Sequence, residues 1–487
     1  MIKKIGIHTL QYLPATLVPA LISLVSVPIY TRLFNPNLYG YYAIATTTIA
    51  FLNAIGIGWL SQATIRYYEI GIKKNQLDNY YATILFSLFL FSSFISILAL
   101  IILYLLKNLL HPILFKLLIL SILCFFSLGI DKTLLAILRA SQRTIFFTSM
   151  EVLTSLSRLG LALFMIFYLK MNILAILIAY LIATMIPVII MASSIIKKRL
   201  LSLSLLSWKL IKELLKYGYP LSFALISLWL LSLANRYLIG FFRGSEEVGY
   251  FSVSSSLSEK PLTMVFSVIM LAAYPIIISV WERSGKKTTI QLISQLSRYY
   301  FIVCIPLVFI LSVLSKEILL VISPDYVKGH IIIPYIASGI FFLGLSQYVG
   351  KGFELLKKTD TYAISMISVG IFNIILTVIL INTIGFLGAG ISTALSYLLL
   401  FILLKHKVKN LLPWKINIQS SILIILSAFI MTIVMIIMKK FFIPNILNLS
   451  VISVSGLIVY SLFLFIFGEI KKSEWDVLQN LLNIKRK

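Results

Sequence analysis

The run YYATILFSLFLFSSFISILALIILYLL, residues 80–106, contains no charged side chain and decides the class of this protein. At 1.5 Å per residue, a helix of this length extends about 40 Å and exceeds the ~30 Å hydrocarbon layer of a bilayer. Similar runs recur along all 487 residues, of which 60% are hydrophobic and 12% charged. Soluble domains are about 25% charged. The sequence therefore predicts an all-α polytopic membrane protein.

The apolar runs predict 14 transmembrane helices joined by short segments. None of these segments is long enough to form a soluble domain. The predicted spans cover residues 9–31, 40–63, 80–106, 113–138, 144–168, 173–196, 217–241, 249–279, 299–315, 331–353, 361–382, 386–404, 417–438 and 446–468.

Basic residues greatly outnumber acidic ones, with 42 Lys and Arg against 16 Asp and Glu and a net charge of +26. In a soluble protein this excess would indicate nucleic acid, but basic loops on the cytoplasmic side of a membrane explain it better. Lys and Arg favour one set of alternate loops by roughly three to one. We therefore predict a multi-pass protein of the cytoplasmic (inner) cell membrane, with both termini in the cytoplasm and no nucleic-acid partner.

Two stretches of the chain resemble each other and predict an internal repeat. RLFNPNLYGYYA (32–43) and RYLIGFFRGSEEVGYFS (236–252) each place an arginine at the outer end of one span and Gly-aromatic-aromatic-small at the start of the next. We predict two six-helix lobes, 1–196 and 217–404, related by a pseudo-two-fold axis and joined by a cytoplasmic linker, 197–216. Two further helices follow in 405–468. The tail, 469–487, is predicted to be amphipathic and to lie on the inner membrane surface.

The same residues resemble a known family. VPIYTRL (27–33) with LYGYYA (38–43), and NRYLIG (235–240) with VGY (248–250), are similar to the signatures of Wzx-like polysaccharide-biosynthesis flippases. That superfamily also contains multidrug extruders and lipid II flippases. The resemblance implies a MATE-like fold of 14 helices. It also implies transport of undecaprenyl-diphosphate-linked repeat units, such as those of O-antigen lipopolysaccharide, to the outer leaflet. One departure is Asn235, where many relatives carry an acidic residue.

Ionisable residues inside spans are functional candidates, because each costs several kcal/mol to bury in a bilayer. Arg158 lies about 21 Å into its span, counting 1.5 Å per residue. Its guanidinium matches phosphate oxygens, which predicts a substrate-binding role in a central cavity. Glu151, two turns earlier, is a candidate for ion coupling. The alternative is that the two residues form a structural ion pair.

A second group of candidates lies at a predicted bend and at the outer ends of two spans. Pro261 predicts a bend beside Glu259, a candidate for ion coupling, and Lys260, a candidate for substrate binding. Equally, these two charges could neutralise partners within the lobe. Arg32 and Arg236 are predicted to bind substrate near an outer gate, although both are within reach of the membrane surface.

Other sequence features argue against an ATP site, a cofactor and a metal site. GLSQYVGK, residues 344–351, has five residues between its glycines, whereas a phosphate-binding loop has four, so we expect no ATP site. We expect no cofactor, metal site or catalytic residue, and a coupling ion, if one is used, would be H⁺ or Na⁺. The aromatic residues near span ends, which include Trp59, Tyr80 and Trp208, are typical of an interfacial belt.

Two alternative functions stay open at this point. A cation-coupled multidrug exporter of the same fold is one, but the first three predicted spans contain no Asp or Glu to bind the cation. A membrane polymerase or ligase acting on the same lipid is the other, but no long outer loop with acid-base groups is present. The chain is therefore predicted not to be an enzyme, and its predicted partners are a lipid-linked oligosaccharide and the bilayer.

Overall fold

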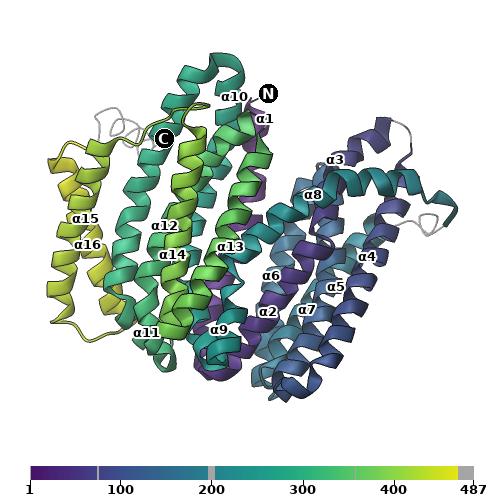
Figure 1. Ribbon diagram of the computed structural model, residues 1–487, viewed down its shortest axis with the longest axis horizontal. Coiled ribbons are helices and arrows are strands. Elements are labelled where there is room, and N and C mark those ends of the chain that lie inside the picture. The colour runs from purple at the N-terminus through teal and green to yellow at the C-terminus, as the bar shows by residue number, and fades with distance from the viewer. Residues whose placement is uncertain (1, 74–75, 196–202, 357, 470–487) are drawn as a thin grey trace, which may run out of the picture. The chain divides into compact units, whose positions relative to one another are not determined.

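The computed structural model describes residues 2–73, 76–195, 203–356 and 358–469, nearly all of them helical. Figure 1 shows the helices. They are α1 Ile2–Leu33, α2 Pro36–Gly56, α3 Gly58–Lys73, α4 Leu77–Leu105, α5 Pro112–Ala140, α6 Thr144–Phe167, α7 Leu174–Ile195, α8 Trp208–Ser232, α9 Asn235–Arg243, α10 Ser245–Val313, α11 Ser315–Ile322, α12 Ile333–Leu355, α13 Thr359–Ile384, α14 Phe386–Val408, α15 Ile418–Lys439 and α16 Ile446–Ile466. Short 3₁₀ turns cover Lys107–Leu109, Leu203–Leu205 and Pro324–Ile332.

Several of these helices begin where the local sequence supplies a cap. The Asn35 side chain accepts a hydrogen bond from the Leu38 amide at 3.0 Å, and a proline follows as the first residue of α2. Asn417 and Asn445 cap α15 and α16 in the same way. Such caps satisfy backbone N–H groups that have no partner within the helix.

The described helices confirm a multi-pass membrane protein. Twelve of them are long and apolar enough to cross a membrane, or 13 if the bent pair α2 and α3 counts as one span. The 69-residue α10 contains two of the predicted spans, 249–279 and 299–315, and its backbone breaks at Gly285, where φ is 74°. The total of 14 spans remains a prediction.

The described residues form two compact units. The first comprises Met1–Val253 and Ala363–Ser396, and the second comprises Ser254–Tyr362 and Tyr397–Lys487. The predicted division into lobes stays a prediction. Most of the predicted tail, and the start of the predicted linker, lie outside the described residues.

The first unit contains the elements that position the site. Its helices α1 and α5–α7 pack against one another, α6 against both α1 and α7 (Figure 1). Trp59 and Tyr80 are 1% and 2% exposed and belong to a core cluster between α3, α4 and α5. The prediction that these two residues form an interfacial belt is therefore wrong, because tertiary packing buries them. Trp208 is 61% exposed, as a belt residue would be.

The second unit has an aromatic core and a terminal helix pair. Tyr300 stacks on Phe341, with ring centroids 5.5 Å apart, and donates a hydrogen bond to its carbonyl. A side chain at Gly344 would overlap the Tyr300 hydroxyl, so packing explains a glycine of the GLSQYVGK segment. The pair α15 and α16 lies side by side at the yellow end of the chain (Figure 1).

Candidate functional site

A cluster of charged residues lies on α5 and α6 in the first unit. The Lys132 ammonium donates a hydrogen bond to Glu151 Oε1 at 2.7 Å and lies 3.7 Å from Asp131 Oδ2. Asp131 is 1% exposed, and its Oδ1 atom has no hydrogen-bond partner. Within the described residues, Glu151 therefore pairs with Lys132. The ion pair between Glu151 and Arg158 that the sequence left open is not formed.

Arg158 occupies a different environment on the same helix, α6. Its guanidinium lies over the Tyr180 ring of α7, 3.8 Å from the centroid. Its Nε atom is buried and has no hydrogen-bond partner. The hydroxyls of Tyr30, Tyr42 and Tyr180 and the Asp131 carboxylate lie within electrostatic range of this guanidinium. The site thus holds a cation on an aromatic face, with N–H donors available to an anion.

Sequence reasoning missed three members of this site. Asp131 and Lys132 lie inside the predicted span 113–138, so the rule that selected Arg158 would also have selected them. Tyr180 carries no such signal, because an aromatic residue in a membrane helix is common. No group of three His, Cys, Asp or Glu residues suited to a metal occurs in the part of the chain that the structure describes.

The two repeat motifs meet at a backbone contact, which we call the glycine seam. A side chain at Gly40 of α2 would overlap the carbonyl of Ser245, and one at Gly249 of α10 would overlap the carbonyl of Pro36. The Ser245 hydroxyl also donates to Asn37 Oδ1. The contact is reciprocal, so each motif supplies the glycine that the other motif needs for close approach.

Polar side chains extend the glycine seam along α2. Arg236 Nη1 donates to Thr47 Oγ1 at 3.2 Å, and the Tyr237 hydroxyl lies 2.6 Å from Thr48 Oγ1. The Trp229 indole donates to the Thr47 carbonyl at 3.2 Å. The structure thus places Arg236 beside the seam. Arg32 lies in the last turn of α1 with an exposed side chain.

Asn235 belongs to a buried neutral network. Its Nδ2 atom donates to Thr393 Oγ1 at 2.9 Å, and Thr377 donates to its Oδ1 atom at 3.1 Å. Ser392 completes the contact with Thr377. The partners of Asn235 are hydroxyl groups and the Ala389 carbonyl, so hydrogen bonding to neutral groups satisfies its polar atoms.

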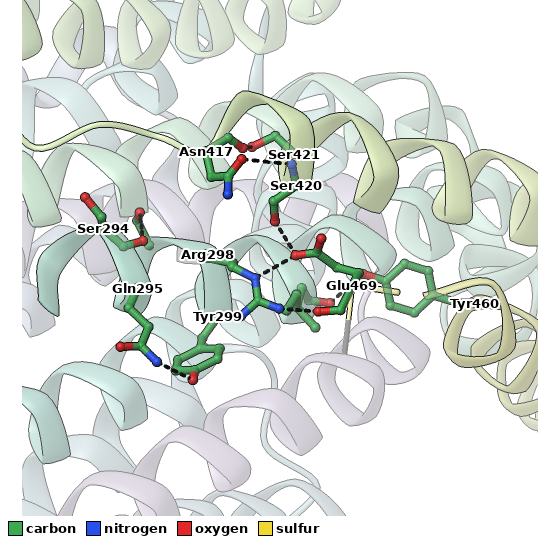
Figure 2. A network of polar contacts seen from close by, with 11 residues as sticks. Ser294, Gln295, Arg298, Tyr299, Asn417, Ser420, Ser421, Tyr460 and Glu469 are labelled. Carbon is green, nitrogen blue, oxygen red and sulfur yellow. Dashed lines mark hydrogen bonds and ion pairs between the residues drawn. The ribbon is translucent and has the colours of Figure 1, made fainter. Parts of the chain in front are cut away.

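The second unit holds the other candidates and one further buried charge. Glu259 and Lys260 lie on α10, and both are partly buried. Arg298, also on α10, donates from Nε to Glu469 Oε1 at 2.6 Å and from Nη2 to the Glu469 carbonyl. Figure 2 shows this pair with Ser420 of α15, whose hydroxyl donates to the same carboxylate. We call this arrangement the Arg298–Glu469 clamp.

The family described as "Polysaccharide biosynthesis protein" matches residues 5–281, more than half of the chain. The chain belongs to the polysaccharide biosynthesis protein family. This membership agrees with the resemblance found in the repeat motifs.

Two curated relatives of this family member are archaeal. An uncharacterized membrane protein of Methanocaldococcus jannaschii is 23% identical over 296 residues, 59% of this chain and 58% of the relative. The probable low-salt glycan biosynthesis flippase Agl15 of Haloferax volcanii is 23% identical over 250 residues, 51% of this chain and 52% of the relative. The chain thus spans a little over half the length of the curated relatives it matches.

Solved structures show the fold of this family member. Lipid II flippase MurJ, in an inward closed conformation, has a TM-score of 0.77 at 18% identity, covering 93% of this chain and 98% of MurJ. An inward-facing multidrug resistance MATE family transporter has a TM-score of 0.59 at 14% identity, covering 84% and 94%. The MATE-like fold predicted from the sequence is confirmed.

Proposed function

We propose that this protein is a flippase that moves undecaprenyl-diphosphate-linked oligosaccharide units from the cytoplasmic to the outer leaflet. Family membership, the similarity to the probable glycan biosynthesis flippase Agl15 and the MurJ-like fold support a transporter of lipid-linked sugars. The protein acts in the cytoplasmic membrane with both termini inside. Surface polysaccharide assembly, such as that of O-antigen, would use the product.

The observation that carries this proposal is the Arg158 guanidinium. Arg158 is partly buried and, among the described residues, forms no ion pair, and such a cation costs several kcal/mol because the bilayer and the protein interior solvate charge poorly. A ring face offsets part of this cost, by about 2 kcal/mol. A diphosphate would offset the remainder, because its oxygens match the paired N–H groups of a guanidinium. The Arg158 guanidinium on the Tyr180 ring thus favours an anionic headgroup over the cationic drugs that a multidrug exporter would carry.

The other charged candidates take supporting roles in this proposal. Lys260, Arg236 and Arg32 contact the headgroup as it moves. Glu151 or Glu259 exchanges a coupling H⁺ or Na⁺, and Lys132 releases Glu151 when the anion arrives. Asn235 takes no part in coupling, because hydrogen bonding already satisfies its amide.

A complementation assay tests the function. The chain, Arg158→Ala and the matched control Arg283→Ala, an exposed arginine, are expressed in a bacterium without its own polysaccharide flippase. We expect the chain and the control to restore surface polymer and drain the inner-leaflet precursor, and Arg158→Ala to lose at least tenfold in both readouts. Resistance to cationic drugs without surface polymer would instead identify the exporter.

Alternating access is the transport mechanism that we propose, with the glycine seam as the outer gate. Helices that touch through two glycines and a few hydrogen bonds separate at a small energetic cost, because little side-chain packing is lost. The predicted topology puts the starts of α2 and α10 on the outer side. The seam would then close that side while the headgroup enters from the cytoplasm.

Crosslinking across the seam tests this mechanism. Asn37→Cys with Ser245→Cys is expected to form a disulfide under oxidant and to block transport until reductant is added. Asn37→Cys alone is the control, and the native Cys124 and Cys304 are buried. Full transport by the crosslinked protein would contradict a gate at this position.

A further inference from the structure

A polar hollow of about 320 Å³ lies in the first unit, away from Arg158, where α3 ends and α4 and α8 begin. We call it the α3–α4–α8 pocket. Its volume is in the range of small-molecule sites, about 300–1,000 Å³. Its polar lining stands out in a chain that is 60% hydrophobic. The proposed function assigns it no role.

Hydrogen bonds between the three helices and the 3₁₀ turn before α8 hold the walls of the pocket in place. The Tyr67 hydroxyl of α3 donates to the Glu213 carbonyl of α8 at 3.3 Å. Asn79 of α4 donates to the Leu205 carbonyl at 3.1 Å. The Tyr80 hydroxyl of α4 donates to the Thr64 carbonyl of α3 at 2.5 Å. The walls therefore need no ligand to hold their shape, which lowers the cost of binding.

Three other polar side chains line the pocket and are not used by this frame. They are the Gln76 amide, the Lys209 ammonium and the Glu213 carboxylate. Among the residues described by the structure, none of the three side chains makes a hydrogen bond or ion pair. Lys209 and Glu213 are one turn apart on α8, a spacing that commonly forms an ion pair. The pocket thus presents a donor, an acceptor and an amide that supplies both.

This set of groups fits a neutral ligand rich in hydroxyl groups. A phosphate would meet both the Lys209 ammonium and the Glu213 carboxylate, so repulsion by the carboxylate would offset attraction by the ammonium. Gln76 and Lys209 are exposed to water and Glu213 is partly exposed, so an apolar ligand would cost about 1–3 kcal/mol for each of these groups that it covers without a hydrogen bond. A sugar hydroxyl both donates and accepts, and its ring carbons pack on aromatic side chains such as Tyr67. The chemistry of the pocket therefore selects a sugar.

The position of the pocket agrees with a sugar attached to a membrane lipid. Trp208, the first residue of α8, is exposed beside Ser207 of the pocket lining, and exposed tryptophan is typical of the membrane–water interface. The predicted topology puts this end of the unit in the cytoplasm, where lipid-linked precursors carry their sugars. We propose that the α3–α4–α8 pocket binds one sugar of the lipid-linked oligosaccharide before translocation, an inference that rests on the proposed function.

Direct sugar binding to the full chain in detergent tests the pocket without requiring transport. Saturation-transfer NMR would be recorded with free glucose, galactose, mannose and N-acetylglucosamine at millimolar concentrations, and binding of inorganic pyrophosphate would be measured by calorimetry. The pocket variant is Lys209→Gln with Glu213→Gln. The matched control is Lys212→Gln with Glu69→Gln, which changes the same residue types outside the pocket lining. We expect at least tenfold weaker binding of one or more sugars by the pocket variant and unchanged binding by the control.

The outcomes separate this inference from the proposed function. No binding of any sugar by the native chain, or equal binding by the pocket variant, would overturn the pocket. So would binding of inorganic pyrophosphate in place of sugar, which would assign an anion site. Sugar binding that depends on the pocket, combined with failed complementation, would support the sugar site and contradict the proposed flippase function. Normal complementation by the pocket variant would overturn its role before translocation.

Discussion

Arg158 is partly buried and Arg298 is buried, both on long helices of the same chain, yet their surroundings differ. The Arg298–Glu469 clamp gives one guanidinium a carboxylate and a carbonyl, and both side chains of the pair are less than 10% exposed. Arg158 has the Tyr180 ring and, among the residues described by the structure, no carboxylate partner. A complete set of partners indicates a structural role, whereas a buried Nε atom without a hydrogen-bond partner indicates a ligand. The three predictions below test this difference.

The largest effect is expected for Arg298→Ala. Removal of the guanidinium leaves the buried Glu469 carboxylate with the Ser420 hydroxyl but no positive charge, and breaking a buried pair costs about 3–5 kcal/mol. Thermal unfolding in detergent should show the loss, while Arg158→Ala, which leaves no such orphan, should stay close to the native stability. The double variant Arg298→Met, Glu469→Leu should recover most of the lost stability, because it buries no unpaired charge. Native-like stability of Arg298→Ala would contradict a structural clamp.

A middle-sized effect is expected for Tyr180→Leu. Loss of the ring removes a cation–π contact of about 2 kcal/mol in a desolvated site, or roughly 30-fold in affinity if Arg158 binds the headgroup. Binding of undecaprenyl diphosphate to the purified protein would measure it. Tyr180→Phe keeps a ring face and serves as the control. Equal losses in the Leu and Phe variants would show that the hydroxyl, not the ring, matters.

The smallest effect is expected for Glu151→Gln. Its partner Lys132 is 42% exposed, and ion pairs with an exposed member contribute about 1 kcal/mol or less. Stability should therefore change little. If Glu151 carries the coupling ion, the dependence of transport on pH or Na⁺ should disappear in this variant and persist in Glu354→Gln, a carboxylate paired with Lys351. An unchanged dependence would remove Glu151 from coupling.

The fold was largely predictable, and the site was predictable in part. Apolar runs such as 80–106 predict helices because a bilayer requires every backbone group to bond within its own segment. The sequence also selects Arg158, because a charge deep in an apolar run needs a partner or a ligand, and its role as a site residue stays a prediction. The partners of that charge were not found. Tyr180 lies 22 positions from Arg158. Glu151 pairs with Lys132 and not with Arg158, the partner that the sequence offers as an alternative. Both contacts depend on how the helices pack.

The repeat motifs show the same limit. The sequence predicts that 32–43 and 236–252 correspond, but only the structure shows that Gly40 and Gly249 each pack against the other motif. Likewise, no local pattern links Arg298 to Glu469, which are 171 positions apart. By itself the sequence determined an all-helical membrane protein with charges that need partners, because hydropathy and helix formation are properties of neighbouring residues. The tertiary structure alone decided which charges form ion pairs and which remain available to a ligand, because ion pairs and hydrogen bonds form only between groups that lie close together in space.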